Sequence, residues 1–234
     1  MRTIGLLGGM SWESTVTYYR LINEGVKQHM GGLHSAKIIM HSVDFQPIEA
    51  CQHKGDWAQT ADILKQAALS VQAGGADFLL ICTNTMHKVA GEIEAVLDIP
   101  ILHIADATAE VLLEQDVKCV GLLGTQFTME QDFYKGRLAD RFGLQVLIPA
   151  RDDRQRVHDI IYKELCLGDV KVASKNEYLR IVNQLADQGA EAIILGCTEI
   201  GLLLQQSDTP IKLFDTTVIH AEKAISCSLM ELRE

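Results

Sequence analysis

ADFLLICTNTMH at residues 76–87 and AEAIILGCTE at residues 190–199 are two versions of one pattern, a continuous apolar run that stops at small polar residues. Such runs are typical of buried parallel strands that lead into helix N-termini. When the two alanines are aligned, Thr83 falls on Cys197. Exposed N–H groups at such turns attract carboxylates and lower the pKa of a thiol. We therefore expect two related halves with anion-binding turns, and a thiol of lowered pKa at Cys197.

The repeat extends beyond these turns. VGLLGT at residues 120–125 repeats IGLLGG at residues 4–9, and PIKLF at 210–214 repeats PILHI at 100–104. Strands that alternate with amphipathic helices predict βαβ units and parallel sheets. We predict an α/β fold of two pseudo-symmetric domains, each a four-stranded parallel sheet flanked by helices. The expected domains are residues 1–104, completed by a C-terminal helix at 216–234, and residues 105–215.

Three further segments are assigned from local patterns. Helical periodicity predicts a helix over residues 12–30 and another over 56–73. The buried face of the first helix is expected to carry Val16, Tyr19, Ile22 and Val26. Residues 44–52 are expected to form an irregular loop. Ligands of open α/β sheets bind beyond the carboxyl ends of the strands, so a cleft between the two halves is the expected site.

Composition limits the functional classes. The chain has 234 residues, 47% of them hydrophobic and 22% charged, which is typical of a globular protein. Its net charge is −10 and it has no basic stripe, so we expect no nucleic-acid partner and no anionic membrane surface. The N-terminus does not read as a signal peptide and no apolar run is long enough to span a bilayer, so we expect a cytoplasmic protein.

Six cysteines occur without a CxxC pair or a cysteine and histidine cluster at zinc spacing, so no metal site is expected. Four of them are expected to be small core residues: Cys82, Cys119, Cys166 and Cys227. The Gly8-Gly9 turn lacks the surrounding residues of a nucleotide-binding loop. His87 is expected to be structural, with orientation of the 83–85 turn as the alternative.

The sequence resembles the cofactor-independent aspartate/glutamate racemase family. The resemblance rests on four motifs: GGMSWEST at 8–15, NTMH at 84–87, GLLGT at 121–125 and GCTE at 196–199. It implies two pseudo-symmetric α/β domains, a homodimer, an amino-acid substrate, and no pyridoxal phosphate or metal. It also implies two cysteines on opposite faces of the substrate Cα, one to remove the α-proton and one to return a proton.

This chain departs from the family pattern because Thr83 stands where the family usually has its first cysteine. The resemblance implies that Cys197 removes the proton from an L-amino acid and that Thr83, or a water held by it, protonates the opposite face. Asn84, Thr85 and Thr198 would bind the substrate carboxylate, while Met10 and Thr125 line the floor. Gln52 and Lys163 would meet the substrate side chain. Aspartate and/or glutamate with a bias to the L enantiomer is the expected substrate.

Two alternatives remain open. A decarboxylase of the arylmalonate type, in the same superfamily, needs only one thiol to protonate a planar enediolate. A carboxylate-binding protein without catalysis is the other alternative, because half of the cysteine pair is missing.

Overall fold

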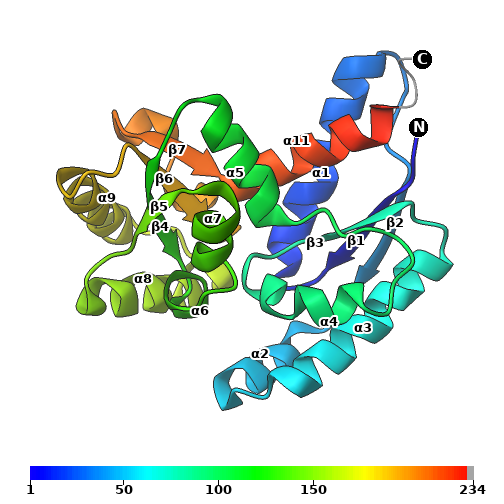
Figure 1. Ribbon diagram of the computed structural model, residues 1–234, viewed down its shortest axis with the longest axis horizontal. Helices are drawn as coiled ribbons and strands as arrows, with labels where there is room; N and C mark the ends of the chain where they lie inside the picture. The colour runs from blue at the N-terminus through cyan, green and yellow to red at the C-terminus, as the bar shows by residue number, and fades with distance from the viewer. Residues whose placement is uncertain (231–234) are drawn as a thin grey trace. The chain divides into compact units, whose positions relative to one another are not determined.

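The computed structural model describes residues 1–230, which divide into two compact units (Figure 1). The first unit contains residues 1–104 and the segment that begins at His220, and the second contains Ala105–Ile219. The chain leaves the first unit after Ile104, before the second copy of the sequence pattern begins at residue 120. It returns four residues inside the last helix, α11 (Thr216–Leu229), instead of at its start. Residues 231–234 of the predicted C-terminal helix lie outside the described residues.

The first unit contains a parallel sheet with the strand order β2-β1-β3. Its strands are β1 (Ile4–Gly8), β2 (Ile38–Ser42) and β3 (Phe78–Ile81). The predicted fourth strand at 100–104 is wrong, because it is reduced to a single bridge between Leu79 and Ile101. Leu79 donates to the carbonyl of Pro100 and accepts from Leu102, and helix α5 (Ile104–Glu114) begins two residues later. The segment is too short to extend the ladder.

The second unit contains the expected four-stranded parallel sheet, with the order β5-β4-β6-β7. Its strands are β4 (Cys119–Gly124), β5 (Gln145–Leu147), β6 (Ala192–Gly196) and β7 (Lys212–Asp215). In each unit the first strand along the chain lies between the second and the third, so the two sheets share one connectivity. The third strands, β3 and β6, carry the repeated turns at their carboxyl ends.

The predicted helices of the first unit are present as α1 (Trp12–Met30) and α3 (Trp57–Ala73). The predicted face of α1 is only half right. Ile22 and Val26 are buried, but Val16 and Tyr19 are each 53% exposed. Tyr18 is buried in their place, and the hydroxyl of Thr15 points back to the β1 turn, where it accepts from the backbone N–H of Gly9. The face is therefore set by contacts with this turn as well as by apolar periodicity.

The predicted loop at residues 44–52 is wrong, since helix α2 (Phe45–Lys54) occupies this segment. Asp44 caps it by accepting from the N–H of Gln46, and Gly55 ends it with a left-handed backbone at φ 71°. Pro47 lies in the first turn of the helix. N–H groups in that turn have no partner within the helix, so a proline is tolerated there.

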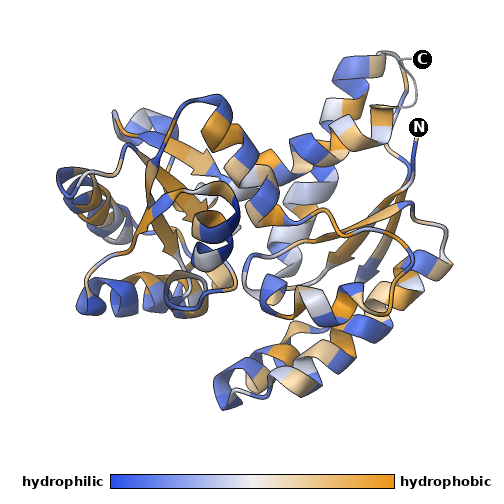
Figure 2. Ribbon diagram, in the orientation of Figure 1, coloured by the Kyte–Doolittle hydropathy of each residue, from blue (hydrophilic) through white to orange (hydrophobic). Residues whose placement is uncertain are grey.

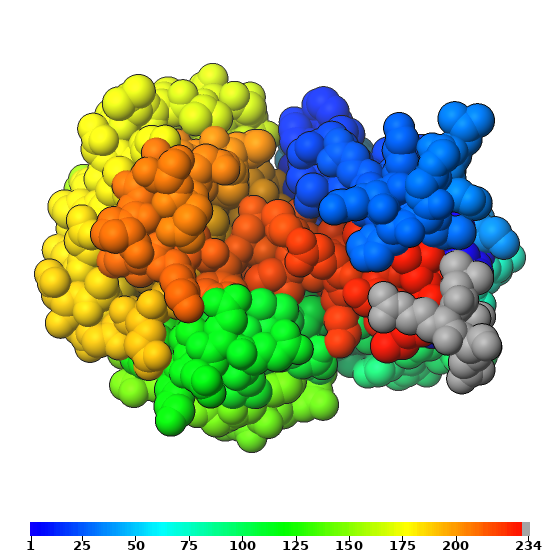
Figure 3. All heavy atoms as spheres, turned by 90° about the horizontal axis from the view of Figure 1, so that it is seen from above, coloured from blue at the N-terminus to red at the C-terminus, as the bar shows by residue number. Residues whose placement is uncertain are grey.

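Side chains of the first sheet alternate between two apolar cores, and both sheets appear as apolar layers in Figure 2. One core packs Leu7, Leu79 and Ile81 against α3. The other packs Leu6, Leu80 and Cys82 against α1 and α11, whose spheres lie side by side in Figure 3. Cys82 is fully buried, which raises the pKa of its thiol. Its expected role as a core residue is confirmed.

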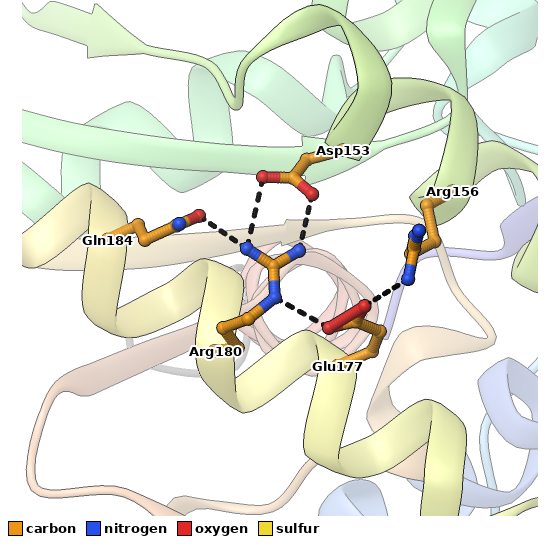
Figure 4. Close-up of polar contacts among 5 residues, drawn as sticks. All are labelled: Asp153, Arg156, Glu177, Arg180 and Gln184. Carbon is orange, nitrogen blue, oxygen red and sulfur yellow. Dashed lines mark hydrogen bonds and ion pairs between the residues drawn. The ribbon is translucent and has the colours of Figure 1, made fainter.

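The helices of the second unit include α8 (Arg151–Lys163) and α9 (Val172–Asp187). Arg180 of α9 holds both carboxylate oxygens of Asp153 on α8 and also donates to Glu177 at 2.6 Å and to Gln184 at 2.8 Å (Figure 4). Arg156 of α8 donates to the other oxygen of Glu177. Hydrogen bonds from Arg180 lower the pKa of Glu177. This network joins the outer surfaces of α8 and α9.

The remaining described helices each have eight residues or fewer, and several of them are 3-10 helices. They are η1 (Thr85–Val89), α4 (Ala90–Glu94), α6 (Gln126–Glu130), α7 (Lys135–Phe142), η2 (Leu165–Leu167), α10 (Ile200–Leu203) and η3 (Gln206–Asp208). Within residues 1–230, no helix combines the length and the apolar character needed to cross a membrane.

Candidate active site

The turn after β3 buries three of the predicted site residues in the first unit. Thr83 is 8% exposed, and Asn84 and Thr85 are more deeply buried. The N–H of Thr83 donates to Ile81, and the N–H of His87 donates to the carbonyl of Asn84 as the 3-10 helix η1 begins. The chain therefore turns tightly at the carboxyl end of the strand and keeps two hydroxyls and an amide at one place.

Met10 lies two residues after β1, which pairs in parallel with β3. It therefore belongs to the same edge of the sheet as Thr83, the edge formed by the carboxyl ends of the strands. Gly9 makes this possible: its φ is 95°, and a Cβ there would clash with the backbone of Val43. Met10 shares one apolar cluster with Met86, and the buried amide of Gln52 lies 3.9 Å from the sulfur of Met86. The first unit thus brings Met10, Gln52 and the 83–85 turn together, with Gln52 on a helix and not on the expected loop.

In the second unit, the turn after β6 carries Cys197, Thr198 and Glu199, all of them buried. The Cys197 thiol donates to Oε2 of Glu199 at 2.9 Å, and the Thr198 hydroxyl donates to the same oxygen at 2.9 Å. One carboxylate oxygen therefore accepts hydrogen bonds from two side chains of the predicted site. Glu199 was absent from the predicted site residues although it lies in the GCTE motif, because a motif does not show which way a side chain points.

The expected lowering of the Cys197 pKa is wrong. Burial raises this pKa well above its ordinary value, and the negative charge of Glu199 and the nearby Cys166 raise it further. The helix that was expected to stabilise a thiolate, α10, has only four residues, so its dipole is small. The resting state of Cys197 is a thiol hydrogen-bonded to a carboxylate.

Thr125 and Lys163 differ in their surroundings. Thr125 follows β4, the strand beside β6, and its hydroxyl accepts from the N–H of Thr128 to cap α6. It therefore lies at the strand edge that carries Cys197. Lys163, at the end of α8, has a 72% exposed side chain, and its amine pairs with Asp159 one turn earlier at 3.2 Å. Its predicted contact with a substrate stays a prediction.

Thr83 and Cys197 belong to different units. Each half of the predicted site is described above by itself, and the predicted placement of the two side chains on opposite faces of a substrate stays a prediction. Among residues 1–230 there is no group of three or more His, Cys, Asp or Glu side chains arranged to hold a metal ion.

A histidine that sequence reasoning missed, His220, lies fully buried in the first unit. Its Nδ1 is 2.9 Å from the hydroxyl of Tyr18, and its Nε2 is 2.7 Å from the carbonyl of Leu102. Burial, together with the nearby His87, lowers its pKa to about 3, and the hydrogen bond to the Leu102 carbonyl opposes the shift. No sequence signal marked His220, because its partners are far away along the chain.

His220 should make the protein less stable in acid. Because its pKa falls from about 6.5 in the unfolded chain to about 3 in the folded protein, the unfolded chain binds more protons between these values. The contribution of His220 to the free energy of unfolding is therefore fully present above pH 6.5 and is lost as the pH decreases toward 3. Between pH 7 and pH 5 this group should cost about 2 kcal/mol of unfolding free energy. Urea unfolding at both pH values should show a smaller loss for His220→Gln than for the wild type, and equal losses would contradict the prediction.

The family model that matches this chain is that of the Asp/Glu/Hydantoin racemases, and the match covers residues 7–224. The chain belongs to this family. The resemblance inferred from the four motifs is thereby confirmed, and with it an amino-acid racemase family of isomerases. Both repeated turns, at residues 83–85 and 197–199, lie within the matched segment.

Individual relatives agree with the family assignment. The racemase fold of a candidate Asp/Glu racemase from Yersinia pestis superposes with a TM-score of 0.91, at 52% identity over 98% of this chain and 100% of that chain. An aspartate racemase homologue from Pyrococcus horikoshii OT3 gives a TM-score of 0.84, at 33% identity over 97% and 99% of the two chains. The broad specificity amino-acid racemase RacX of Bacillus subtilis (strain 168) is 25% identical over 69% of each chain.

Proposed function

We propose that this protein racemises amino acids, most readily aspartate and/or glutamate, without pyridoxal phosphate or a metal and with a bias to the L enantiomer. The observation that carries the proposal is the hydrogen bond of 2.9 Å between the Cys197 thiol and the Glu199 carboxylate. This pair supplies a thiol together with an acceptor for its proton, within a racemase family.

The first step uses both members of the pair. Glu199 accepts the thiol proton, and the resulting Cys197 thiolate takes the proton from Cα of the L-amino acid. The electron pair of the broken C–H bond moves into the substrate carboxylate and forms a planar enediolate. Burial of the pair favours the neutral thiol at rest, so a neighbouring acceptor is needed when the thiol must act as a base.

The second step returns a proton to the opposite face of Cα. In this proposal the Thr83 hydroxyl, or a water held by it, donates that proton to Cα. It regains a proton from water, and Glu199 releases the proton that it took from the thiol, which restores the starting state. A hydroxyl is a far weaker acid than a thiol. At neutral pH much less alkoxide than thiolate is therefore present to act as a base. Removal of a proton from the D enantiomer is therefore slower, which gives the bias to L substrates.

The substrate carboxylate is proposed to bind Asn84, Thr85 and Thr198, with Met10 and Thr125 on the floor. These side chains are all buried at strand ends, where N–H groups are also available. Gln52 is proposed to contact the substrate side chain. RacX is named for broad specificity, and Gln52 is an uncharged contact, so the substrate range is proposed to extend beyond the two acidic amino acids. The proposed assembly is a homodimer.

One observation favours a second candidate reaction. The only thiol at either repeated turn that is hydrogen-bonded to a carboxylate is Cys197, since Cys82 lies in the core. A single thiol suffices for a decarboxylase of the arylmalonate type, in which it protonates the enediolate left by loss of carbon dioxide. Release of carbon dioxide from a substituted malonate, measured beside racemisation, separates the two reactions.

Incubation of the protein with each L-amino acid in heavy water tests the proposal. We expect loss of the Cα proton signal and appearance of the D enantiomer with L-aspartate or L-glutamate. Thermal stabilisation by these amino acids without any exchange at Cα would favour a carboxylate-binding protein instead. Absence of both exchange and stabilisation would reject the substrate class.

Thr83→Cys should raise turnover of the D enantiomer by about 10-fold or more, because a thiol is a far better base than a hydroxyl near neutral pH. The measurement compares initial rates from D- and L-glutamate in this variant and in the wild type. Thr85→Cys is the matched control, since it adds a thiol to the same turn at a position proposed only to bind the carboxylate. Unchanged D turnover in Thr83→Cys would count against the assignment of faces.

A further inference from the structure

Three buried histidines of the first unit form a cluster beside the Thr83 turn. The ring centroid of His87 lies 4.4 Å from that of His103 and 6.0 Å from that of His220. They come from three elements: η1, the segment that follows Pro100, and the distant helix α11. The proposed reaction does not use any of these imidazoles, so their arrangement needs a separate explanation.

Two hydrogen bonds of His87 define the position of its ring proton. Its Nδ1 lies 2.8 Å from the carbonyl oxygen of Thr83, and the N–H of Ile104 donates to its Nε2 at 3.2 Å. A backbone N–H can only donate, so Nε2 is the acceptor and carries no proton. The proton is therefore on Nδ1, where it is donated to Thr83. His87 is a neutral imidazole whose tautomer is set by both of its neighbours.

His220 holds the same segment from its other end. Its Nε2 donates to the carbonyl of Leu102 and its Nδ1 accepts from the Tyr18 hydroxyl. Leu102 and Ile104 flank His103, and Ile104 is the last residue before the chain leaves the first unit. Two imidazoles thus fix residues 102–104, and one of them is also bonded to the backbone of Thr83.

We propose that His87 is a positioning residue that fixes the backbone of Thr83 and couples it to the segment through which the chain leaves the first unit. The inference rests on the proposed function, because it assigns His87 to the step in which Thr83 takes part. The Thr83 carbonyl is bonded to a rigid ring instead of to a flexible side chain. Displacement of a reacting group by about 1 Å can cost about 10²-fold in rate, so this bond affects the step at Thr83.

The two proposed steps can be separated with L-glutamate that carries deuterium at Cα. Release of deuterium into water requires Cys197, whereas formation of D-glutamate also requires Thr83. His87→Gln keeps a polar atom near the Nε2 position and loses the donor to Thr83, and His87→Asn does the opposite. We expect the amount of D-glutamate formed per deuterium released to fall about 10-fold or more in His87→Gln and to stay within about twofold of the wild type in His87→Asn.

His29→Gln is the matched control. The Nδ1 of His29 contacts the carbonyl of Gly25 four residues earlier at 2.8 Å, which is the same local bond as that of His87, but on the exposed surface of α1. The amount of D-glutamate formed per deuterium released should be the same in His29→Gln as in the wild type. If His87→Gln lowers release and inversion equally, His87 has only a structural role and the proposal is overturned. If the wild type releases no deuterium, the proposed function itself fails.

A second measurement does not depend on how the variants fold. Nitrogen-15 NMR of histidine in the wild-type protein at pH 7 should show His87 protonated at Nδ1. A ring protonated at Nε2, or at both nitrogens, cannot make the two bonds described above and would overturn the proposal.

Discussion

Cys197→Ala should reduce deuterium release from Cα of L-glutamate by about 10³-fold or more, because the variant has no thiolate to take the Cα proton. Cys197→Ser should be nearly as inactive, since a buried hydroxyl beside the Glu199 carboxylate is far harder to deprotonate than a thiol. The measurement is the initial rate of deuterium release, together with the urea midpoint of each variant to show that the fold is retained.

Cys166→Ser is the matched control for this prediction. Cys166 is near enough to raise the pKa of Cys197, yet it is outside the proposed chemistry. Its variant should keep activity within a few-fold of the wild type. Substantial exchange in Cys197→Ala with normal behaviour of Cys166→Ser would assign the base to another residue and reject the proposed first step.

Glu199→Gln should lower kcat/KM for L-glutamate by about 10²-fold at pH 7, within the range for loss of a proton acceptor. Two effects oppose each other here. Removal of the negative charge lowers the pKa of Cys197, which favours the thiolate, whereas removal of the carboxylate leaves no nearby acceptor for the thiol proton. We expect the second effect to dominate, because the thiol remains buried and a glutamine cannot take its proton.

The pH profile distinguishes these effects. In Glu199→Gln the thiol must lose its proton to water, so activity should rise as the pH increases from 7 to 10. Thr198→Val is the control for the shape of the pH profile, because it removes the second hydrogen bond to the same carboxylate oxygen and keeps the proton acceptor. Its rate should be lower at every pH, since Thr198 is also proposed to bind the substrate, but it should not rise from pH 7 to 10 as in Glu199→Gln. A Glu199→Gln variant that is faster than the wild type at pH 7 would show that the carboxylate only suppresses the thiolate.

The parts of the fold that depend on local patterns were predictable from the sequence. Continuous apolar runs located β3 and β6, and the repeat indicated one connectivity in both units. The errors have local causes. Pro47 is harmless in the first turn of α2, and the segment after Pro100 enters α5 before it can form a strand.

The sequence named candidate site residues, whose roles stay predictions, but it could not predict their electrostatics. Alignment of the two turns marked Thr83 and Cys197 without any coordinates. The pKa of Cys197 depends on the orientation of the Glu199 side chain and on the short length of α10, neither of which a motif contains. His220 was missed for a similar reason, because it meets Tyr18 only after distant segments have packed together.

The first unit is assembled from two segments that are far apart along the chain, and this affects the order in which the units fold during synthesis. Ile225 of α11 packs beside Gly25 of α1, where a larger side chain would not fit, and the N–H of Arg2 donates to the carbonyl of Ser228. During synthesis, the apolar face of α1 that packs against α11 therefore stays uncovered until α11 has left the ribosome. The second unit is continuous and is synthesised before α11 is complete, so it can fold earlier than the first unit.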